Sequence, residues 1–209
     1  VMGRGAVVGE RIVGDPRVAA VSFTGSQAVG KGVAVACAQR LAKVQLEMGG
    51  KNPQVVLDDA DLEVAVNCAV QSAYFSTGQR CTAASRLIVT QGIHDRFVAA
   101  LGERIRALKV DDALKDGTEV GPVVDQRQLD QDLEYIEIGK REGAKLAVGG
   151  ERLERATPGF YLRPALFTET TPSMRINREE IFGPVAAVIR VKDYDEALAV
   201  ANDTPFGLS

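Results

Sequence analysis

The sequence is poor in the residues on which many catalytic and metal sites depend. It has one histidine, His94, and three cysteines, Cys37, Cys68 and Cys81, with no CxxC pair. A mechanism that pairs a histidine base with serine or cysteine has a single candidate, which "GIHDRF" places exposed in the first turn of a helix. An odd number of widely spaced cysteines argues against a disulfide framework or a zinc site. We therefore expect a reducing, cytoplasmic location and no bound metal.

Long apolar runs and basic clusters are missing as well. No segment approaches the roughly 18 apolar residues that span a bilayer, and the start shows no signal-peptide pattern. The formal net charge is −3, which argues against nucleic acid or an anionic membrane as a partner. The hydrophobic share of 45% and charged share of 25% are those of an ordinary globular protein, with enough residues for a substantial core.

Strand-like and helix-like segments alternate along the chain. Predicted strands lie at 17–22, 43–50, 53–57, 85–91, 144–150, 160–169 and 184–191. Predicted helices lie at about 31–40, 61–75, 94–108, 126–143 and 193–203. The first and last strands are expected to be buried. The alternation predicts an α/β layered fold with a largely parallel sheet.

The stretch "SFTGSQAVGKG", residues 22–32, runs from a strand through a turn into a helix. Ser26 and the backbone N–H groups at the helix start could bind a phosphate group. The same residues could instead form a plain corner in which Ser26 is the N-cap. The stretch is not a GxGxxG fingerprint, so both interpretations stay open.

Two stretches place carboxylates within a few residues of a glycine. In "LEMGGKNP", residues 46–53, Glu47 follows an apolar strand; a partly buried Glu47 would have a raised pKa and could act as a general base. An exposed glutamate at a strand end is the alternative. In "NREEIFGPVAAV", residues 177–188, Glu179 and Glu180 are adjacent and would point to opposite faces of a strand, which does not indicate a cooperating acid pair.

Cys81 differs from the other two cysteines in its neighbours. Cys37 in "VAVACAQ" and Cys68 in "AVNCAVQ" lie among small apolar residues on predicted helices, which indicates core packing. Cys81 lies in "FSTGQRCTAASR", where Gly78 suggests a turn and Arg80 could favour a thiolate if its side chain approaches. Cys81 is the best candidate nucleophile, with a small core residue as the alternative.

Five stretches in order resemble the aldehyde dehydrogenase superfamily: "FTGS", "LEMGGKNP", "GQRC", "EEIFGPV" and "ANDTPFGLS". The last departs from the usual family pattern, which has tyrosine at Phe206. The resemblance covers essentially the whole chain and is nearest to the α-ketoglutarate semialdehyde dehydrogenase branch. Since family members are about twice as long, we expect a fragment of a longer enzyme.

The resemblance implies covalent catalysis. Cys81 matches the nucleophile that attacks an aldehyde to form a thiohemiacetal, from which NAD(P)+ takes a hydride to leave a thioester. Glu47 matches the general base that activates water to hydrolyse the thioester. The implied reaction is the oxidation of an aldehyde, here a carboxylate-bearing semialdehyde, to the acid.

The resemblance also implies contacts to NAD or NADP. Glu180 matches the carboxylate that binds the nicotinamide ribose, and Phe182 the aromatic residue near the nicotinamide. Gly25 and Ser26 match the turn at the pyrophosphate, and Gln128 a ribose contact.

The family architecture implies a domain boundary and missing parts. Residues 1–48 correspond to the end of the dinucleotide-binding domain, and 49–209 to the cysteine-bearing catalytic domain, cut short at its C-terminus, with a three-layer α/β fold. The longer enzyme is expected to be a homodimer or homotetramer. An oxyanion donor that the family supplies from an earlier segment typically contributes about 10²–10³-fold in rate, so we expect little activity from these residues alone.

Two other functions remain as alternatives. In a CoA-acylating or phosphate-using relative, a thiol or phosphate takes the acyl group, although Glu47 favours hydrolysis. A non-catalytic interaction fragment would keep the five stretches only by descent.

Overall fold

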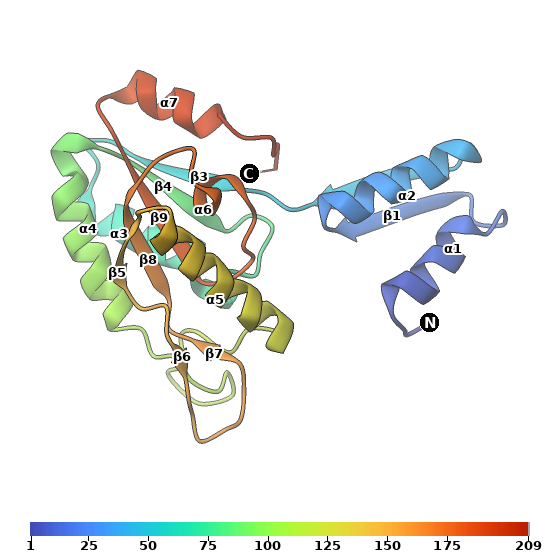
Figure 1. Ribbon diagram of the computed structural model, residues 1–209, viewed down its shortest axis with the longest axis horizontal. Coiled ribbons are helices and arrows are strands. Elements are labelled where there is room, and N and C mark those ends of the chain that lie inside the picture. The colour runs from blue at the N-terminus through green and yellow to red at the C-terminus, as the bar shows by residue number, and fades with distance from the viewer. Residues whose placement is uncertain (209) are drawn as a thin grey trace. The chain divides into compact units, whose positions relative to one another are not determined.

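The computed structural model describes residues 1–208 as two compact units (Figure 1). The first unit is Val1–Gly49, and the second begins at Gly50. The division therefore falls within the glycine pair that follows Glu47 and Met48. Each unit has its own sheet and is described by itself.

The first unit is a two-stranded parallel sheet with helical segments. In chain order its elements are η1 (Gly5–Gly9), α1 (Glu10–Gly14), β1 (Ala20–Gly25), α2 (Gln27–Gln39) and β2 (Lys43–Met48). Helix α2 makes the crossover that two parallel strands require. Cys37 on α2 is fully buried, which confirms the prediction that it packs in the core.

The prediction of a buried strand at 17–22 is wrong in its limits and its burial. Strand β1 begins at Ala20, and Ala20, Ser22 and Thr24 are exposed, whereas Val21 and Phe23 are half-buried. The reason is the size of the sheet: with two strands, β1 has one hydrogen-bonded neighbour within the unit, and α2 lies over the face toward which Phe23 points.

The second unit is built on a five-stranded sheet in the order β3-β4-β9-β8-β5. These strands are β3 (Asn52–Val56), β4 (Ala84–Thr90), β9 (Val185–Val191), β8 (Ala165–Thr170) and β5 (Lys145–Val148). All neighbouring pairs are parallel except β5 with β8, which is antiparallel. A separate small hairpin pairs β6 (Arg152–Leu153) with β7 (Tyr161–Leu162).

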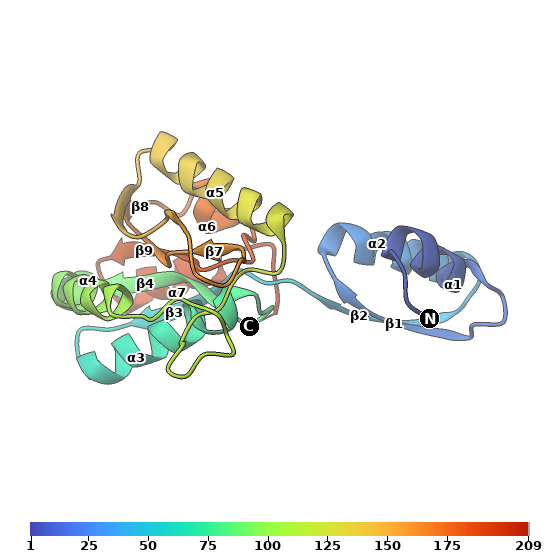
Figure 2. The ribbon, with the colours of Figure 1, turned by 90° about the horizontal axis from the view of Figure 1, so that it is seen from below.

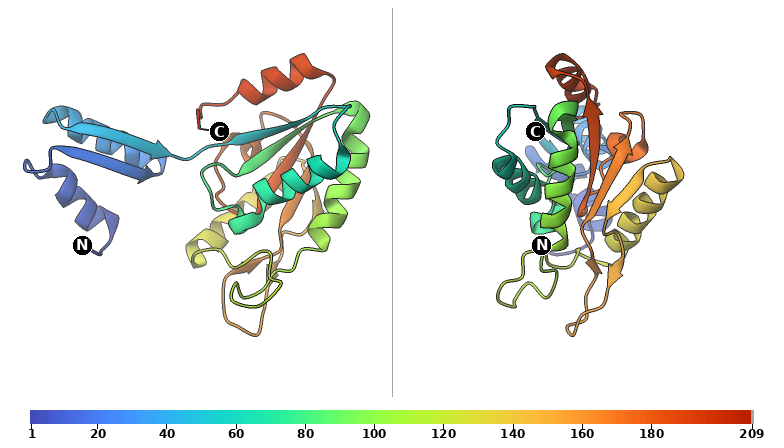
Figure 3. Two further views of the ribbon diagram at one scale, coloured as in Figure 1. Left: turned by 180° about the vertical axis from the view of Figure 1, so that it is seen from behind. Right: turned by 90° about the vertical axis from the view of Figure 1, so that its left-hand side faces the viewer.

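Helices cover both faces of this sheet (Figures 2 and 3). They are α3 (Leu62–Ala73), η2 (Phe75–Gly78), α4 (Gln91–Arg106), α5 (Gln126–Arg141), α6 (Arg175–Arg178) and α7 (Tyr194–Asn202). Helices α3 and α4 lie on one face, and α5 lies on the other. Along β4, Leu87 and Val89 belong to the core beneath α3 and α4, whereas Ile88 packs against α7. This alternation confirms the predicted three-layer α/β fold with a largely parallel sheet.

Aspartates begin three helices of this unit. Asp61, Asp125 and Asp193 are the N-caps of α3, α5 and α7, and each Oδ1 accepts a backbone N–H three residues later at 2.8–3.0 Å. The cap of α3 is thus Asp61. Helix α5 ends before Gly143, whose φ of +93° is typical of a glycine that follows a helix.

His94 is buried, so the prediction of an exposed side chain is wrong. Helix α4 begins at Gln91, three residues before the predicted start, and its phase turns His94 inward beside Ile93 and Phe97. His94 Nδ1 lies 2.8 Å from Asp95 Oδ1, which also accepts a hydrogen bond from Arg190. The helices of residues 1–208 include none long and apolar enough to cross a membrane.

Candidate active site

Cys81 lies in the loop between α3 and β4, after a tight turn. Ser76, Thr77 and Gly78 all have positive φ, of 54°, 58° and 66°. Left-handed backbone costs of order 1–3 kcal/mol at each non-glycine residue and persists where surrounding contacts fix it. This turn reverses the chain after Tyr74 and leaves the Cys81 side chain exposed, which contradicts its interpretation as a small core residue.

Contacts from two segments fix this turn and the residues that follow it. Thr77 Oγ1 donates to Gly121 O at 3.3 Å, and Gln79 Oε1 accepts the backbone N–H of Val124 at 3.0 Å. On the other side, Asn52 Nδ2 donates to Cys81 O at 2.8 Å. The Cys81 backbone is therefore tied to β3, and the turn before it to the segment that leads into α5.

Arg80 does not serve the role that the sequence suggests for it. Its Nη2 donates to the carbonyl groups of Gln71 and Ser72 at 2.7 and 2.9 Å, near the C-terminal end of α3. A cation there is favourable because the last carbonyls of a helix lack intrahelical partners. Arg80 stabilises the end of α3, and the structure gives no contact between its guanidinium and the thiol.

Glu180 is half-buried beside the start of the unit. Its Oε1 accepts the backbone N–H of Gly50 at 3.2 Å. Burial raises the pKa of Glu180, and the Gly50 hydrogen bond and the charge of Lys51 oppose this shift. Lys51 is itself 1% exposed, and burial, with the charge of Arg86, lowers its pKa to about 7. Glu180 is thus a carboxylate with one oxygen tied to the backbone, next to a buried amine.

Glu179 has different partners. It accepts hydrogen bonds from Arg175 at 2.8 and 2.9 Å and from Tyr135 Oη at 2.6 Å. The Arg175 guanidinium lowers the pKa of Glu179. Glu179 and Glu180 follow α6 in a loop and not on a strand, and their separate contacts agree with the prediction that they are not a cooperating pair.

Phe182 has a φ of +63° and its side chain is exposed. Positive φ is uncommon for an aromatic residue and marks a segment whose backbone is fixed by its surroundings. The next residue, Gly183, is buried, and its carbonyl contacts Gly78 so closely that a Cβ at 78 would collide with it. The Cys81 loop and the Glu180–Gly183 segment therefore touch, and Gly78, Arg80, Glu180 and Phe182 border one small pocket.

Gln128 lies on the first turn of α5 beside the same segment. Its Nε2 donates to Asp132 Oδ1 at 2.8 Å and to Ile181 O at 3.0 Å. The ribose contact of Gln128 stays a prediction. Because Nε2 already has two partners, Oε1 is the atom that would make this contact.

The remaining predicted site residues lie in the first unit, at the carboxyl ends of its parallel strands. Thr24 pairs with Glu47 and Gly25 with Met48 in the register of β1 and β2. Glu47 is exposed and its Oε1 accepts Gln45 Nε2 at 3.3 Å. Within this chain, therefore, Glu47 matches the alternative of an exposed glutamate at a strand end.

Ser26 is the N-cap of α2, and its Oγ accepts the Val29 N–H at 3.4 Å. This confirms the strand–turn–helix corner. Gly25 leaves the corner without a side chain, and the 13-residue α2 directs its first backbone N–H groups toward it. Donors of this kind fit a pyrophosphate. In the second unit, a half-buried carboxylate and an exposed ring at Glu180 and Phe182 fit a ribose and a nicotinamide.

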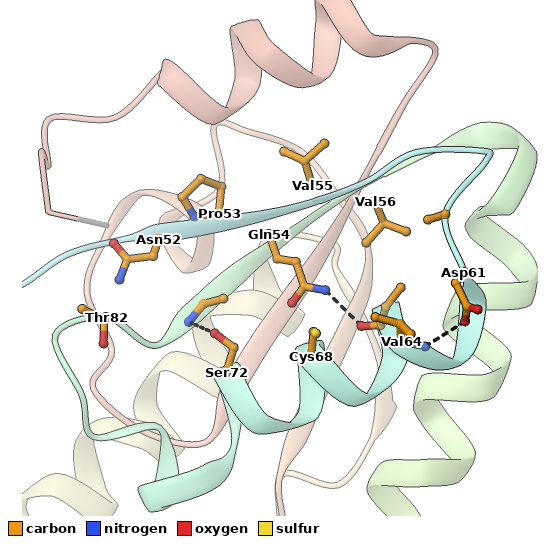
Figure 4. A pocket seen from close by; sticks show the side chains of 13 residues that line it. Asn52, Pro53, Gln54, Val55, Val56, Asp61, Val64, Cys68, Ser72 and Thr82 are labelled. Carbon is orange, nitrogen blue, oxygen red and sulfur yellow. Dashed lines mark hydrogen bonds between the residues drawn. The ribbon is translucent and has the colours of Figure 1, made fainter.

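Cys68 lies apart from these residues and is exposed, so the prediction that it packs in the core is wrong. It faces a groove between α3 and the edge strand β3 (Figure 4). Gln54 crosses the groove and donates to Ala65 O at 3.0 Å. Small neighbours do not bury Cys68 because β3 is the last strand of the sheet, and no described strand of the unit lies beyond it.

Sequence analysis missed two buried titratable groups. Lys51 lies within "LEMGGKNP", and its Nζ has no partner among the described residues. Asp132 is fully buried on α5. The available signal was helical phase, because Asp132 lies three residues after buried Leu129 and four before buried Ile136.

The amino-acid sequence matches that of the aldehyde dehydrogenase family over residues 1–209. The chain belongs to this family. α-Ketoglutaric semialdehyde dehydrogenase of Bacillus subtilis strain 168 is 50% identical over 211 residues, which are 100% of this chain and 43% of that protein. Betaine aldehyde dehydrogenase of Cereibacter sphaeroides strain ATCC 17029 is 44% identical over 209 residues, 100% of this chain and 43% of that protein.

Solved aldehyde dehydrogenases have the same fold. The crystal structure of betaine aldehyde dehydrogenase from Staphylococcus aureus in complex with NAD+ superimposes with a TM-score of 0.96 at 39% identity, covering 99% of this chain and 41% of that one. The chain thus spans about two fifths of the length of the relatives it matches. The predicted family is confirmed, as is the likeness to the semialdehyde dehydrogenase branch.

Proposed function

We propose that this chain contributes the nucleophile and part of the cofactor site to an NAD(P)+-dependent aldehyde dehydrogenase. The observation on which this rests is the exposed Cys81, which follows a strained turn that contacts the Glu180–Gly183 segment. Membership of the family supports it. In this proposal residues 1–48 belong to the dinucleotide-binding domain and 49–209 to the catalytic domain.

Cys81 performs the covalent step. Its thiolate attacks the aldehyde carbon, and the carbonyl oxygen becomes the oxyanion of a thiohemiacetal. A bound NAD(P)+ would supply the acceptor for the hydride of this carbon, and Gly25, Ser26, Glu180 and Phe182 would hold it. Loss of the hydride from the thiohemiacetal leaves a thioester on Cys81. Glu47 then removes a proton from water, whose oxygen attacks the thioester and releases the acid and the Cys81 thiolate.

The other residues hold the cofactor. The Glu180 carboxylate accepts the ribose hydroxyl groups, because one of its oxygens is already oriented by Gly50. Phe182 offers its exposed ring to the nicotinamide end. Gly25, Ser26 and the start of α2 bind the pyrophosphate, and Gln128 Oε1 is available to the ribose.

The substrate is an aldehyde that bears a carboxylate, such as a semialdehyde. The 50% identity to a relative named α-ketoglutaric semialdehyde dehydrogenase supports this choice. NAD and NADP both satisfy the contacts in this chain. A homodimer or homotetramer and a cytoplasmic location complete the proposal, and the absence of disulfides between Cys37, Cys68 and Cys81 supports the latter.

The test uses the full-length protein, expressed from its complete gene, with a panel of semialdehydes and simple aldehydes. Reduction of NAD+ or NADP+ is followed by absorbance, and the product is identified as free acid or acyl-CoA. Cys81→Ser is expected to lower turnover by about 10³-fold or more, whereas Cys37→Ser and Cys68→Ser keep it.

Three results would contradict the proposal in different ways. Turnover that survives Cys81→Ser removes the nucleophile assignment. Acyl-CoA as the product indicates an acyl-transferring relative, and no oxidation of any aldehyde by the wild type indicates a non-catalytic protein.

Glu47→Gln should leave the first turnover intact and slow later ones, since it affects only hydrolysis of the thioester.

A further inference from the structure

Asp132 is a buried carboxyl group for which the proposed mechanism has no use. It lies on the second turn of α5, is 0% exposed, and its Oδ2 has no hydrogen-bond partner among the described residues. Burial of an unpaired carboxyl group is costly and is tolerated where the surrounding structure depends on it. Its surroundings therefore indicate what it does.

The Asp132 carboxyl group lies directly against Gly183. Its Oδ1, Cγ and Oδ2 occupy the space where a Cβ at residue 183 would be. Gly183 in turn presses its carbonyl group against Gly78, at the turn before Cys81. Asp132, Gly183 and Gly78 thus form one continuous line of contact from α5 to the Cys81 loop.

Asp132 also orients the donor that fixes Ile181. Gln128 Nε2 bridges Asp132 Oδ1 at 2.8 Å and Ile181 O at 3.0 Å, and Gln131 Nε2 donates to the same carbonyl at 2.8 Å. Two amide donors on one carbonyl restrict the backbone immediately before Phe182, whose φ is +63°. The left-handed backbone of Phe182 is therefore held by side chains of α5.

The same end of α5 restrains the Cys81 loop from a second direction. The segment that leads into the helix provides the carbonyl of Gly121 to Thr77 and the N–H of Val124 to Gln79. The start of α5 and this segment consequently contact both loops. A change at α5 would displace the two loops together.

We infer that Asp132 is a positioning residue, whose buried carboxyl group sets the Glu180–Gly183 segment against the Cys81 loop by supporting Gly183 and orienting Gln128. The importance of this for catalysis rests on the proposed function. The arrangement itself rests on contacts within the second unit. Burial also raises the pKa of Asp132 to about 7, so a neutral side chain of the same shape suits the position.

The test compares three variants of the full-length protein. Asp132→Leu removes the acceptor with a side chain of the same branched shape, and Asp132→Asn keeps the acceptor. Asp130→Leu is the matched control, because Asp130 forms the same i,i+4 pair with Gln126 at 2.6 Å but is exposed. Circular dichroism first establishes that each variant is folded.

Hydrogen exchange is the readout that does not depend on activity. Asp132→Leu should speed exchange in the peptides that contain residues 75–83 and 178–184 together, by about tenfold. It should also lower kcat/KM on the order of 10²-fold, because the reacting groups lose their alignment. Asp132→Asn and Asp130→Leu should stay near the wild type in both measurements.

The inference is overturned if folded Asp132→Leu leaves both peptides as protected as before, or if Asp132→Asn is as damaging as Asp132→Leu. Should Asp132→Leu not fold, Asp132→Ala replaces it, because alanine also removes the acceptor and the support of Gly183 but adds no volume. That variant should speed exchange in the same two peptides about tenfold, and unchanged exchange would overturn the inference. If the wild type oxidises no aldehyde, the proposed function fails, while the exchange measurements still test Asp132.

Discussion

The two units of this chain position their site residues in opposite ways. In the first, Ser26 and Glu47 are exposed, and the contacts that orient them come from residues two or three positions away. In the second, the residues around Cys81 and Glu180 are fixed by contacts between segments far apart in sequence, such as Asn52 with Cys81 and Gly50 with Glu180. The first site depends on local geometry and the second on the packing of a complete three-layer core.

This difference predicts different responses to substitution. A change in the first unit should have a small, local cost, because water is available to replace a lost contact. A change in the second should cost more and propagate, because close-packed groups have nowhere to move. Three pairs of substitutions test this contrast.

Gly183→Ala is expected to have the largest effect. The added methyl group would occupy the space of the Asp132 carboxyl group, and overpacking of this kind costs about 3 kcal/mol. Gly32→Ala on α2 is the control in the first unit, where nothing lies within 4 Å of the new methyl group. It should stabilise its helix by up to about 1 kcal/mol, and denaturant unfolding gives both values. Equal effects of the two substitutions would break the comparison.

Lys51→Met is expected to have an intermediate, pH-dependent effect. Burial lowers the pKa of Lys51 from 10.5 to about 7, so the unfolded chain binds more protons between these values. The wild type therefore gains stability as the pH rises from 7 toward 10. Lys51→Met should remove this dependence on pH. The variant's free energy of unfolding should exceed that of the wild type most below pH 7.

Lys43→Met is the matched control for Lys51, since Lys43 is exposed on β2 of the first unit. It should leave the dependence of the free energy of unfolding on pH unchanged. The measurement is denaturant unfolding at several pH values between 6 and 10. A Lys51→Met variant whose pH profile matches the wild type would mean that the ammonium group is solvated in solution.

The helix caps should show the smallest effects. Ser26 Oγ accepts its N–H at 3.4 Å, whereas Asp125 Oδ1, at the start of α5, accepts its own at 2.8 Å. Ser26→Ala should cost about 0.5 kcal/mol and Asp125→Ala about 1–2 kcal/mol, because the shorter bond also involves a charge. Hydrogen exchange should report the first loss in α2 alone and the second in both α5 and the Cys81 loop. The reverse order of costs would contradict the contrast between the units.

Most elements were predictable from sequence because their signals are local. Short runs of apolar residues mark β4 and β9, aspartates mark the starts of α3, α5 and α7, and Gly143 ends α5. Cys81 and Glu180 could also be predicted as site residues from short stretches of sequence. The burial of single side chains was less predictable: the predictions of an exposed His94 and a buried Cys68 were both wrong. Their neighbours in sequence do not determine which helix face meets the core or which strand ends the sheet.

By itself, the sequence determined the family, the alternation of strands and helices, and the candidate nucleophile, since each depends on the order of residues over a few turns or strands. Only the tertiary structure decided that Gly78, Gly183 and Asp132 meet, and that Lys51 is buried. Those contacts join residues separated by tens of positions, and a glycine or an aspartate has the same local propensities with or without them. The physical reason is that local propensity is a property of one segment, whereas close packing and desolvation are properties of all the segments that converge on a point.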